Sequence, residues 1–482
     1  MKPIVEQEEE EAAAAPLTGG LKNWAVDIQS EADRMNTAAE TEKWRKHSIY
    51  RVPTCIKDLN PKAYTPQVVS FGPHHHGEQE LAPMEEHKRR SVLHLLRRSR
   101  KRFDNFVEAV ETVEQQLMDA YERLDERWSG EGVEQFRQMM VVDGCFMLEV
   151  LRAATAVNPP EDYAPNDPIF SPHGLLYMVP CIKRDMLMLE NQLPLLVLDK
   201  LIAVETGRTK NDDHINRMVQ RCFAPNERYV SMPLGLHPLD VYRRILLQLG
   251  GTKSAQKMAA AGDHPHHDEE GGLFDTVRSA MELYEAGIRF KRSRSNSLQD
   301  IRFKHGVLSL PAVVVDDLTE AMFRNMMAFE RLHVGAGNDV TSFVFFMDSI
   351  IDSAKDVALL QWKGLIQNAM GSDKAVAKLF NSLSKEVPLD PDSPLDRLQR
   401  RVNRYCRQNW NKWRANLVHT YFRSPWAFLS LAAAIFLLIL TVAQTVFTIL
   451  QWQQGLNDNN SPSPAGTSPS DNIAPSPILP TL

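Results

Sequence analysis

The chain has 482 residues, of which 43% are hydrophobic and 24% charged, a composition that excludes a largely disordered protein. The formal net charge is −6, and because nucleic-acid-binding domains present a basic face, this balance argues against general nucleic-acid binding. The five cysteines stand far apart without a C-x-x-C pair, which predicts reduced core thiols rather than a zinc ribbon or a disulfide framework.

The N-terminal segment, residues 1–20, is acidic and is predicted to be disordered. It lacks the basic start and apolar run of a secretory signal, so we expect the body of the protein to stay in the cytosol. A helical pattern begins at 21–46, where we expect Trp24, Ile28 and Trp44 to act as anchors.

Residues 21–396 are predicted to form a helical soluble domain. Apolar residues recur there at every third and fourth position, which indicates amphipathic helices. A polar insertion is expected at 250–272, and the β-branched alternation around His305-Gly306 predicts a small hairpin. The fold class is therefore mainly α with a small β element, the helices being expected at 101–127, 133–156, 174–187, 193–206, 273–287, 319–333, 340–370 and 395–423.

The motifs that mark phosphate loops, dinucleotide sites, nucleophile elbows and zinc proteases are all missing from the sequence. The run His74-His75-His76 is a weak metal candidate, because neighbouring side chains of an extended segment point to opposite faces. We assign no metal ligand, no cofactor and no catalytic residue. Four carboxylates in apolar contexts stay open either as a catalytic pair or as helix caps and partners of Arg137, Arg152 or Arg184: Asp143, Glu149, Asp185 and Glu190.

Two serines lie in the basic stretch KRSRSNS. Ser295 and Ser297 each follow an arginine by three residues, the spacing that basic-directed kinases favour. A phosphate there could pair with neighbouring arginines, and the other interpretation is an ordinary exposed basic loop. We predict both serines as candidate phosphorylation sites.

Residues 427–450 carry no charge over 24 residues and reach roughly 36 Å as a helix, enough to cross a hydrocarbon core of about 30 Å. We predict a transmembrane helix at 426–450, with Trp426 and Trp452 at the two membrane interfaces. A basic juxtamembrane helix is predicted at 397–425, whose interfacial cations include Arg404, Arg407, Lys412, Arg414 and Arg423. Because no Lys or Arg follows the span, the positive-inside rule places the body in the cytosol and the tail outside or in a lumen, at the plasma membrane or an endomembrane.

One side of the predicted span is small or polar, which allows helices to approach in lipid, although Ser and Thr can instead bond to their own backbone. This candidate stripe for self-association consists of Ser430, Ala434, Thr441, Gln444, Thr445 and Thr448. The tail, 451–482, is rich in Pro, Ser, Asn and Gly and is predicted to be disordered, with a glycosylation sequon at Asn459.

Ordered blocks over residues 47–450 resemble the plant family known as domain of unknown function 247. They include IYRVP at 49–53, VVSFGPHHHGEQELAPMEEHKRR at 68–90, DGCFMLEVL at 143–151, DMLMLENQLPLLVLDKL at 185–201, ELYEAGIRFK at 282–291, FRNMMAFE at 323–330 and YFRSPWAFLSLAAA at 421–434. The resemblance implies a plant protein with a C-terminal transmembrane helix and no agreed catalytic residues. Some similar grass members are linked to pollen self-incompatibility. His74 departs from the aromatic residue that is usual there, and the 250–272 insertion departs as well.

The main hypothesis from the sequence is a membrane-anchored protein whose cytosolic body binds protein partners. This binding would serve signalling, and self-incompatibility is one form of signalling that fits. The bilayer and unidentified proteins are the expected partners. The rival hypotheses are an uncharacterised membrane-tethered enzyme and a homo-oligomer built through the transmembrane stripe.

Overall fold

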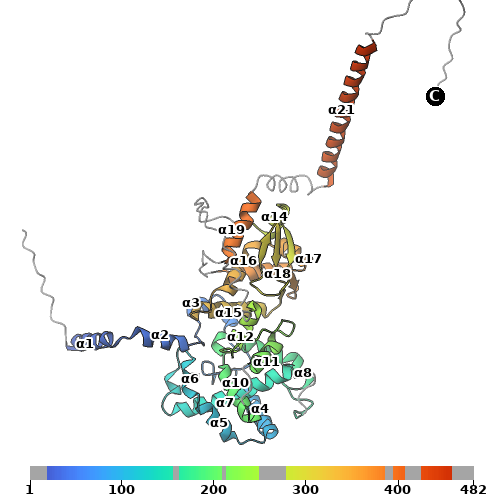
Figure 1. The fold of residues 1–482 in the computed structure, drawn as a ribbon. Helices are drawn as coiled ribbons and strands as arrows, with labels where there is room; N and C mark the ends of the chain where they lie inside the picture. Colours follow the sequence, from blue (N-terminus) through green and yellow to red (C-terminus); the bar gives the residue numbers. More distant parts are fainter. Residues whose placement is uncertain are drawn as a thin grey trace, which may run out of the picture. The chain divides into compact units, whose positions relative to one another are not determined.

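The computed structural model describes residues 19–155, 162–208, 213–248, 278–385, 394–407 and 425–458. The chain divides into a body, Met1–Arg407, and a C-terminal unit, Gln408–Leu482. The body is mainly helical, as Figure 1 shows. It also contains two small sheets, and this confirms the predicted fold class. The predictions for residues 1–18, the 250–272 insertion and the tail from residue 459 lie outside the described residues.

The first half of the body is built around α7 (Gly132–Thr155), which confirms the helix predicted at 133–156. Almost every residue of α7 from Met139 to Leu151 is buried, because neighbouring helices cover it on several sides. A Cβ on Gly144 would lie only 2.7 Å from Leu201 and Val197, so this glycine sets how closely two helices approach. The helices that surround α7 are α4 (Pro83–Ser99), α5 (Phe103–Glu111), α10 (Leu195–Thr206) and α11 (Asp213–Phe223).

The remaining helices of this half are short and link the larger ones. The predicted helix at 101–127 is divided, because α5 ends at Glu111 and α6 begins at Glu114. The short helices are α3 (Thr54–Lys57), α6 (Glu114–Asp119), α8 (Pro172–Tyr177) and α9 (Val179–Asp185), with 3₁₀ turns η1 (Pro61–Ala63), η2 (Glu126–Trp128) and η3 (Leu189–Asn191).

The second half of the body packs helices against the two small sheets. Its helices are α12 (Pro238–Leu247), α14 (Ala280–Glu285), α15 (Thr319–Leu332), α16 (Asp339–Ile350), α17 (Ala354–Trp362), α18 (Asp373–Leu383) and α19 (Pro394–Arg407). The helix predicted at 273–287 is described only as α14, since residues up to 277 are not described.

The first sheet has the strand order β1-β3-β2, from β1 (Arg289–Arg292), β2 (Arg302–Lys304) and β3 (Val307–Leu310). β2 and β3 are antiparallel, which confirms the predicted hairpin. Its two turn residues, His305 and Gly306, both have positive φ, as the tight turns that match strand twist require. β1 pairs parallel to β3, an arrangement that the sequence did not predict.

A second sheet corrects the helix predicted at 340–370. That region contains α16 and α17 and then β5 (Ile366–Asn368), which pairs parallel with β4 (Val313–Val315). Gly364 has φ +69 just after α17, a conformation that ends the helix and that side chains with a Cβ resist. The apolar run therefore leaves the helix and joins a distant strand.

The predicted helix at 21–46 forms as α1 (Gly19–Arg34) and α2 (Thr37–Lys46), with Asn36 capping α2. The expectation that its apolar residues act as anchors was wrong within this chain. Trp24 is 62% exposed and Trp44 57% exposed, and α2 buries no residue. α2 is rich in charged and polar residues and presents no broad apolar face to the body.

The C-terminal unit contains α21 (Pro425–Asp458). Within it, Ala432–Gln454 is long and apolar enough to cross a membrane, and none of that window is buried against protein. The helix runs beyond the predicted end at residue 450 and through 451–458, where the sequence predicted the start of a disordered tail. The polar residues there include no proline, so nothing local ends the helix at the last apolar turn.

Candidate functional site

Asp185 is one of the four candidate carboxylates. It fastens part of the segment 52–72, which runs between the helices and is called the extended segment here, to the helical core. Its Oδ2 accepts hydrogen bonds from the backbone N–H groups of Gln67, Val68 and Val69 at 3.0, 2.7 and 3.1 Å. The side chain is fully buried, and burial raises the pKa of Asp185 against the lowering effect of these donors. The carboxylate therefore satisfies three amides that belong to no helix or strand.

Asp143 binds the same extended segment a few residues further on. Its Oδ2 accepts the Gly72 N–H at 2.8 Å, and its Oδ1 lies 2.7 Å from the Lys88 ammonium. Lys88 is 0% exposed and also contacts Glu85 at 2.7 Å and the Ser70 hydroxyl at 3.0 Å, so all three of its N–H donors have partners. Burial raises the pKa of Asp143, and the Lys88 charge opposes that rise.

Glu190 holds the beginning of the segment. It accepts the Val52 N–H at 2.7 Å and the Lys57 ammonium at 2.8 Å, and its Oε2 lies 3.4 Å from His75 Nε2. Burial raises the pKa of Glu190, but the hydrogen bonds from His75 and Lys57 outweigh it and lower the pKa to about 2. The Glu190 carboxylate is therefore ionised at neutral pH, and each of its two oxygens accepts a hydrogen bond.

Glu149 lies away from the extended segment. It contacts Arg98 and Arg152 and accepts the Tyr163 hydroxyl at 3.0 Å. Of the predicted arginine partners, Arg152 thus pairs with Glu149, and Arg184 lies 3.4 Å from Asp185. Arg137 instead binds glutamates at the surface, Glu114 at 2.7 Å and Glu134 at 2.7 Å.

Each of the four carboxylates is thus committed to backbone amides or cations inside the body. A catalytic acid or base needs an oxygen that a substrate can reach. The geometry favours the structural interpretation, in which Asp143, Asp185 and Glu190 fix the path of residues 52–72 between the helices and Glu149 pairs with arginines.

Sequence reasoning missed the amide side chains that complete this network. Asn191 accepts the Phe71 N–H at 2.7 Å and donates to the Val69 carbonyl at 3.0 Å. Asn325 accepts the Leu189 N–H at 2.8 Å and donates to the Ala63 carbonyl at 2.7 Å. The available signal was the polar triplet at 190–192 inside the apolar run DMLMLENQLPLLVL, since polar side chains in such a run need internal partners.

The three histidines at 74–76 separate into different environments. The His74 ring lies edge-on to Tyr121 at 5.5 Å between centroids, and the His76 ring lies edge-on to Trp128 at 5.5 Å. His75 Nδ1 instead contacts Glu78 at 2.7 Å. Burial lowers the pKa of His74 to about 4. The described residues contain no group of three or more His, Cys, Asp or Glu side chains placed to hold a metal ion.

His74 gives a pH-dependent prediction. Its pKa is about 6.5 when the chain is unfolded and about 4 in the fold, so its stabilising effect is complete above pH 6.5 and is lost as the pH falls towards 4. From pH 7 to pH 5 the original chain should lose stability by protonation of His74, and His74→Phe should not. The free energy of unfolding of His74→Phe relative to the original chain should therefore rise by about 1–2 kcal/mol over this interval. Urea unfolding at the two pH values measures this, with exposed His173→Phe as the control. An equal pH dependence in His74→Phe and the original chain would contradict the assignment.

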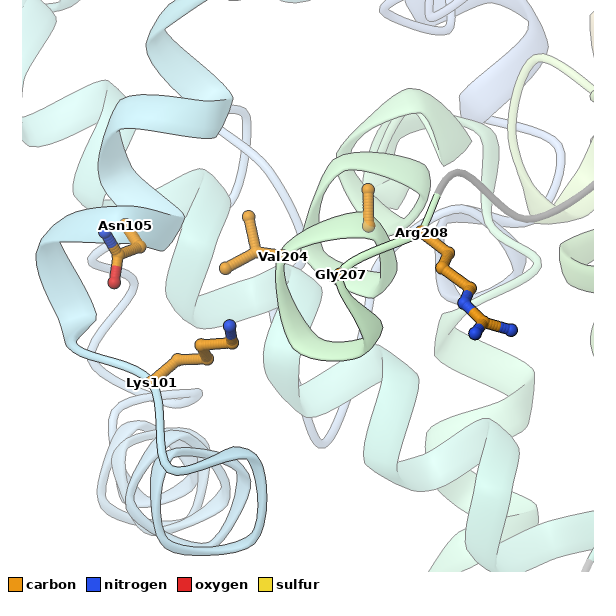
Figure 2. Close-up of a pocket in the computed structure, with 6 residues that line it drawn as sticks. Lys101, Asn105, Val204, Gly207 and Arg208 are labelled. Carbon is orange, nitrogen blue, oxygen red and sulfur yellow. The ribbon is translucent and has the colours of Figure 1, made fainter.

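A cavity of about 430 Å³ lies between the start of α5 and the end of α10, and Figure 2 shows the residues that line it. Lys101 and Asn105 stand on one side of it and Val204 and Gly207 on the other. Its lining residues include no carboxylate, histidine or cysteine. A second cavity, of about 310 Å³, is lined by residues that include Cys181, Arg184 and Asp316. None of the four candidate carboxylates lines either of these two cavities.

The two candidate phosphorylation sites differ in access. Ser297 is buried, and its hydroxyl donates to the Leu247 carbonyl at the end of α12 at 2.9 Å. Ser295 is half-buried, and its hydroxyl donates to Asp300 at 2.8 Å. A kinase would reach Ser295 with less rearrangement, and phosphorylation itself stays a prediction.

The basic juxtamembrane segment begins as α19, whose Leu398, Val402 and Cys406 are buried against the body. Arg404 and Arg407 point outward as exposed residues, as an interfacial role requires. Three of the predicted interface residues lie outside the described residues, namely Lys412, Arg414 and Arg423.

In the C-terminal unit, Trp452 is exposed, whereas nothing is described of the Trp426 side chain. Three hydroxyls of the predicted association stripe bond within their own helix: Thr441 to Leu437, Thr445 to Thr441 and Thr448 to Gln444, each at 2.8 Å to the carbonyl oxygen. Gln444 and Ala434 are exposed. Self-association therefore stays a prediction that would depend on close backbone approach and Gln444 rather than on the threonine hydroxyls. Asn459 lies just outside the described residues.

Comparison with known proteins places the chain among plant proteins. The UPF0481 protein At3g47200 of Arabidopsis thaliana is 32% identical over 448 residues, covering 87% of this chain and 90% of the relative. The putative UPF0481 protein At3g02645 of the same plant is 24% identical over 515 residues, covering 87% and 93%. No solved structure matches the chain significantly. The family model described as "Plant protein of unknown function", domain of unknown function 247, matches residues 49–440, and the chain therefore belongs to this plant family.

Proposed function

We propose that this protein is a single-pass, membrane-anchored plant protein whose body lies in the cytosol and binds protein partners in signalling. Self-recognition of the self-incompatibility kind is one form that such signalling could take. The observation that carries the proposal is α21, whose Ala432–Gln454 window is apolar, without acid or base, and covered by no protein within the described residues. A window of this length reaches roughly 34 Å, enough for a bilayer core.

Two further observations support an interaction role over catalysis. The carboxylates that were the best candidates for acid–base chemistry hold backbone amides and buried cations instead. The cavity beside α5 is lined by no carboxylate, histidine or cysteine that could act as a nucleophile or a base.

The orientation is tested by protease access on sealed membrane vesicles whose cytosolic side faces outward. The full chain carries a C-terminal tag, and the body is followed by an antibody to residues of α7. We expect protease to digest the body while the tag stays protected, because the arginines precede the span and no base follows it. A digested tag with a protected body would overturn the proposal and would place the body in a lumen or outside the cell.

A further inference from the structure

The three-stranded sheet has one mainly apolar face, with Arg292 exposed at its end, and one basic face. In register, Arg289 of β1 stands beside Val307 of β3, which stands beside Lys304 of β2. Two residues along, Lys291 stands beside Ser309, which stands beside Arg302. Residues paired across strands share a face, so the four cations surround Val307 and Ser309 on one side of the sheet.

Burial confirms this division of the sheet. The four basic residues are exposed, whereas Phe290 and Leu308, on the opposite face, are buried. Strand spacing places the cations of β1 about 10 Å from those of β2, and residues two apart in one strand lie about 7 Å apart. We call this array, Arg289, Lys291, Arg302 and Lys304, the basic sheet face.

The local charge is strongly positive although the chain as a whole is acidic. Residues 289–304 contain six basic residues and one acid, Asp300. Asp300 binds Arg302 at 2.7 Å, and in the part of the chain that the structure describes the other three cations of the face make no ion pair. Like charges at these separations repel, so the array is favoured by an anionic partner that lies across several of them at once.

The path of the chain after the sheet indicates the kind of anionic partner. α19 packs against β2, where the Tyr405 ring lies edge-on to Phe303 at 5.4 Å between centroids. Figure 1 shows α19 beside this sheet. From Arg407, at the end of α19, only 17 residues lead to Pro425, the first residue of the apolar helix. Fully extended, they reach about 60 Å at most, so the chain leaves the body beside this sheet and must enter the apolar helix within that distance.

We propose that the basic sheet face binds the anionic headgroups of the membrane that anchors the protein. The inference rests on the proposed membrane anchoring and deepens it, because it assigns the face that contacts the bilayer. An open sheet surface with cations spread over two rows suits a layer of headgroups rather than one enclosed small anion. Cytosolic leaflets carry anionic lipids, and basic residues near such a surface are attracted over about a Debye length.

The test uses the full chain in nanodiscs of phosphatidylcholine alone or with about 30% phosphatidylserine. Lysines are acylated briefly with an N-hydroxysuccinimide ester and quantified by peptide mass spectrometry. We expect Lys291 and Lys304 to react about threefold or more slowly in the anionic discs, and this protection to vanish near 1 M salt, where screening is nearly complete. Exposed Lys62 and Lys374, on other parts of the body, should react equally in both discs.

A charge-matched pair of variants makes the test specific. Arg289→Gln with Arg302→Gln should remove most of the protection at Lys291 and Lys304. Arg89→Gln with Arg97→Gln, which removes two exposed arginines of α4, should leave it intact. Equal acylation in the two kinds of disc, or equal protection of Lys62, would overturn the inference. A chain that does not co-elute with discs at all would instead contradict the membrane anchoring.

Discussion

Asp185→Ala is expected to lower the free energy of unfolding by about 3–5 kcal/mol, because it leaves three buried N–H groups without an acceptor, each a loss of about 1–3 kcal/mol. The groups belong to Gln67, Val68 and Val69, whose backbone forms no ladder that could replace the carboxylate. Urea unfolding of the full chain in a neutral detergent, followed by near-ultraviolet circular dichroism, measures the change. Asp58→Ala removes an exposed aspartate and should change stability by less than about 0.5 kcal/mol.

A loss below about 1 kcal/mol in Asp185→Ala would mean that water or another side chain satisfies the three amides. The extended segment would then not depend on this carboxylate, and Asp185 would not be what fastens it to the helical core. Asp185→Asn separates charge from acceptor, because its amide oxygen can still accept the same hydrogen bonds. We expect Asp185→Asn to be less destabilised than Asp185→Ala.

Lys88→Met is expected to lower the free energy of unfolding by a similar amount. It leaves the Asp143 carboxylate, 1% exposed, without its cation, and removing one partner of a buried pair typically loses about 3–5 kcal/mol. Replacing both partners, as Lys88→Met with Asp143→Leu, removes the unpaired charge as well. The double variant should therefore be more stable than Lys88→Met alone by about 1 kcal/mol or more.

The same urea measurement decides the Lys88 prediction. The loss of unfolding free energy in the double variant could equal the sum of the losses in Lys88→Met and Asp143→Leu. The two charges would then not be coupled, which would contradict the prediction. Exposed Lys62→Met is the matched control for the substitution.

The local features of the fold were predictable from sequence. The signal for α7 was an apolar period that runs from Phe136 to Ala153, and the signal for the hairpin was His305-Gly306 between alternating apolar residues. Both signals lie within about twenty residues of chain. The parallel pairing of β1 with β3 left no such signal, because three of the four β1 residues are charged and only tertiary contact selects them as a strand.

The buried network was only partly predictable. The apolar context of Asp185 and Asp143 identified them as unusual, but the backbone amides that they bind lie 71 to 118 residues away, and no sequence spacing encodes such contacts. The basic sheet face was missed for the same reason. Its cations come from two strands that flank a third, so they gather on one face only once the register is set.

Alkaline extraction tests most directly whether α21 anchors the protein in a bilayer. Membranes from cells that express the full chain are extracted with alkaline carbonate, which strips peripheral proteins and leaves integral ones. We predict that the full chain and a variant truncated after Asp458 stay in the membrane pellet, and that a variant truncated before Pro425 is released. Release of the full chain into the supernatant would contradict the anchoring.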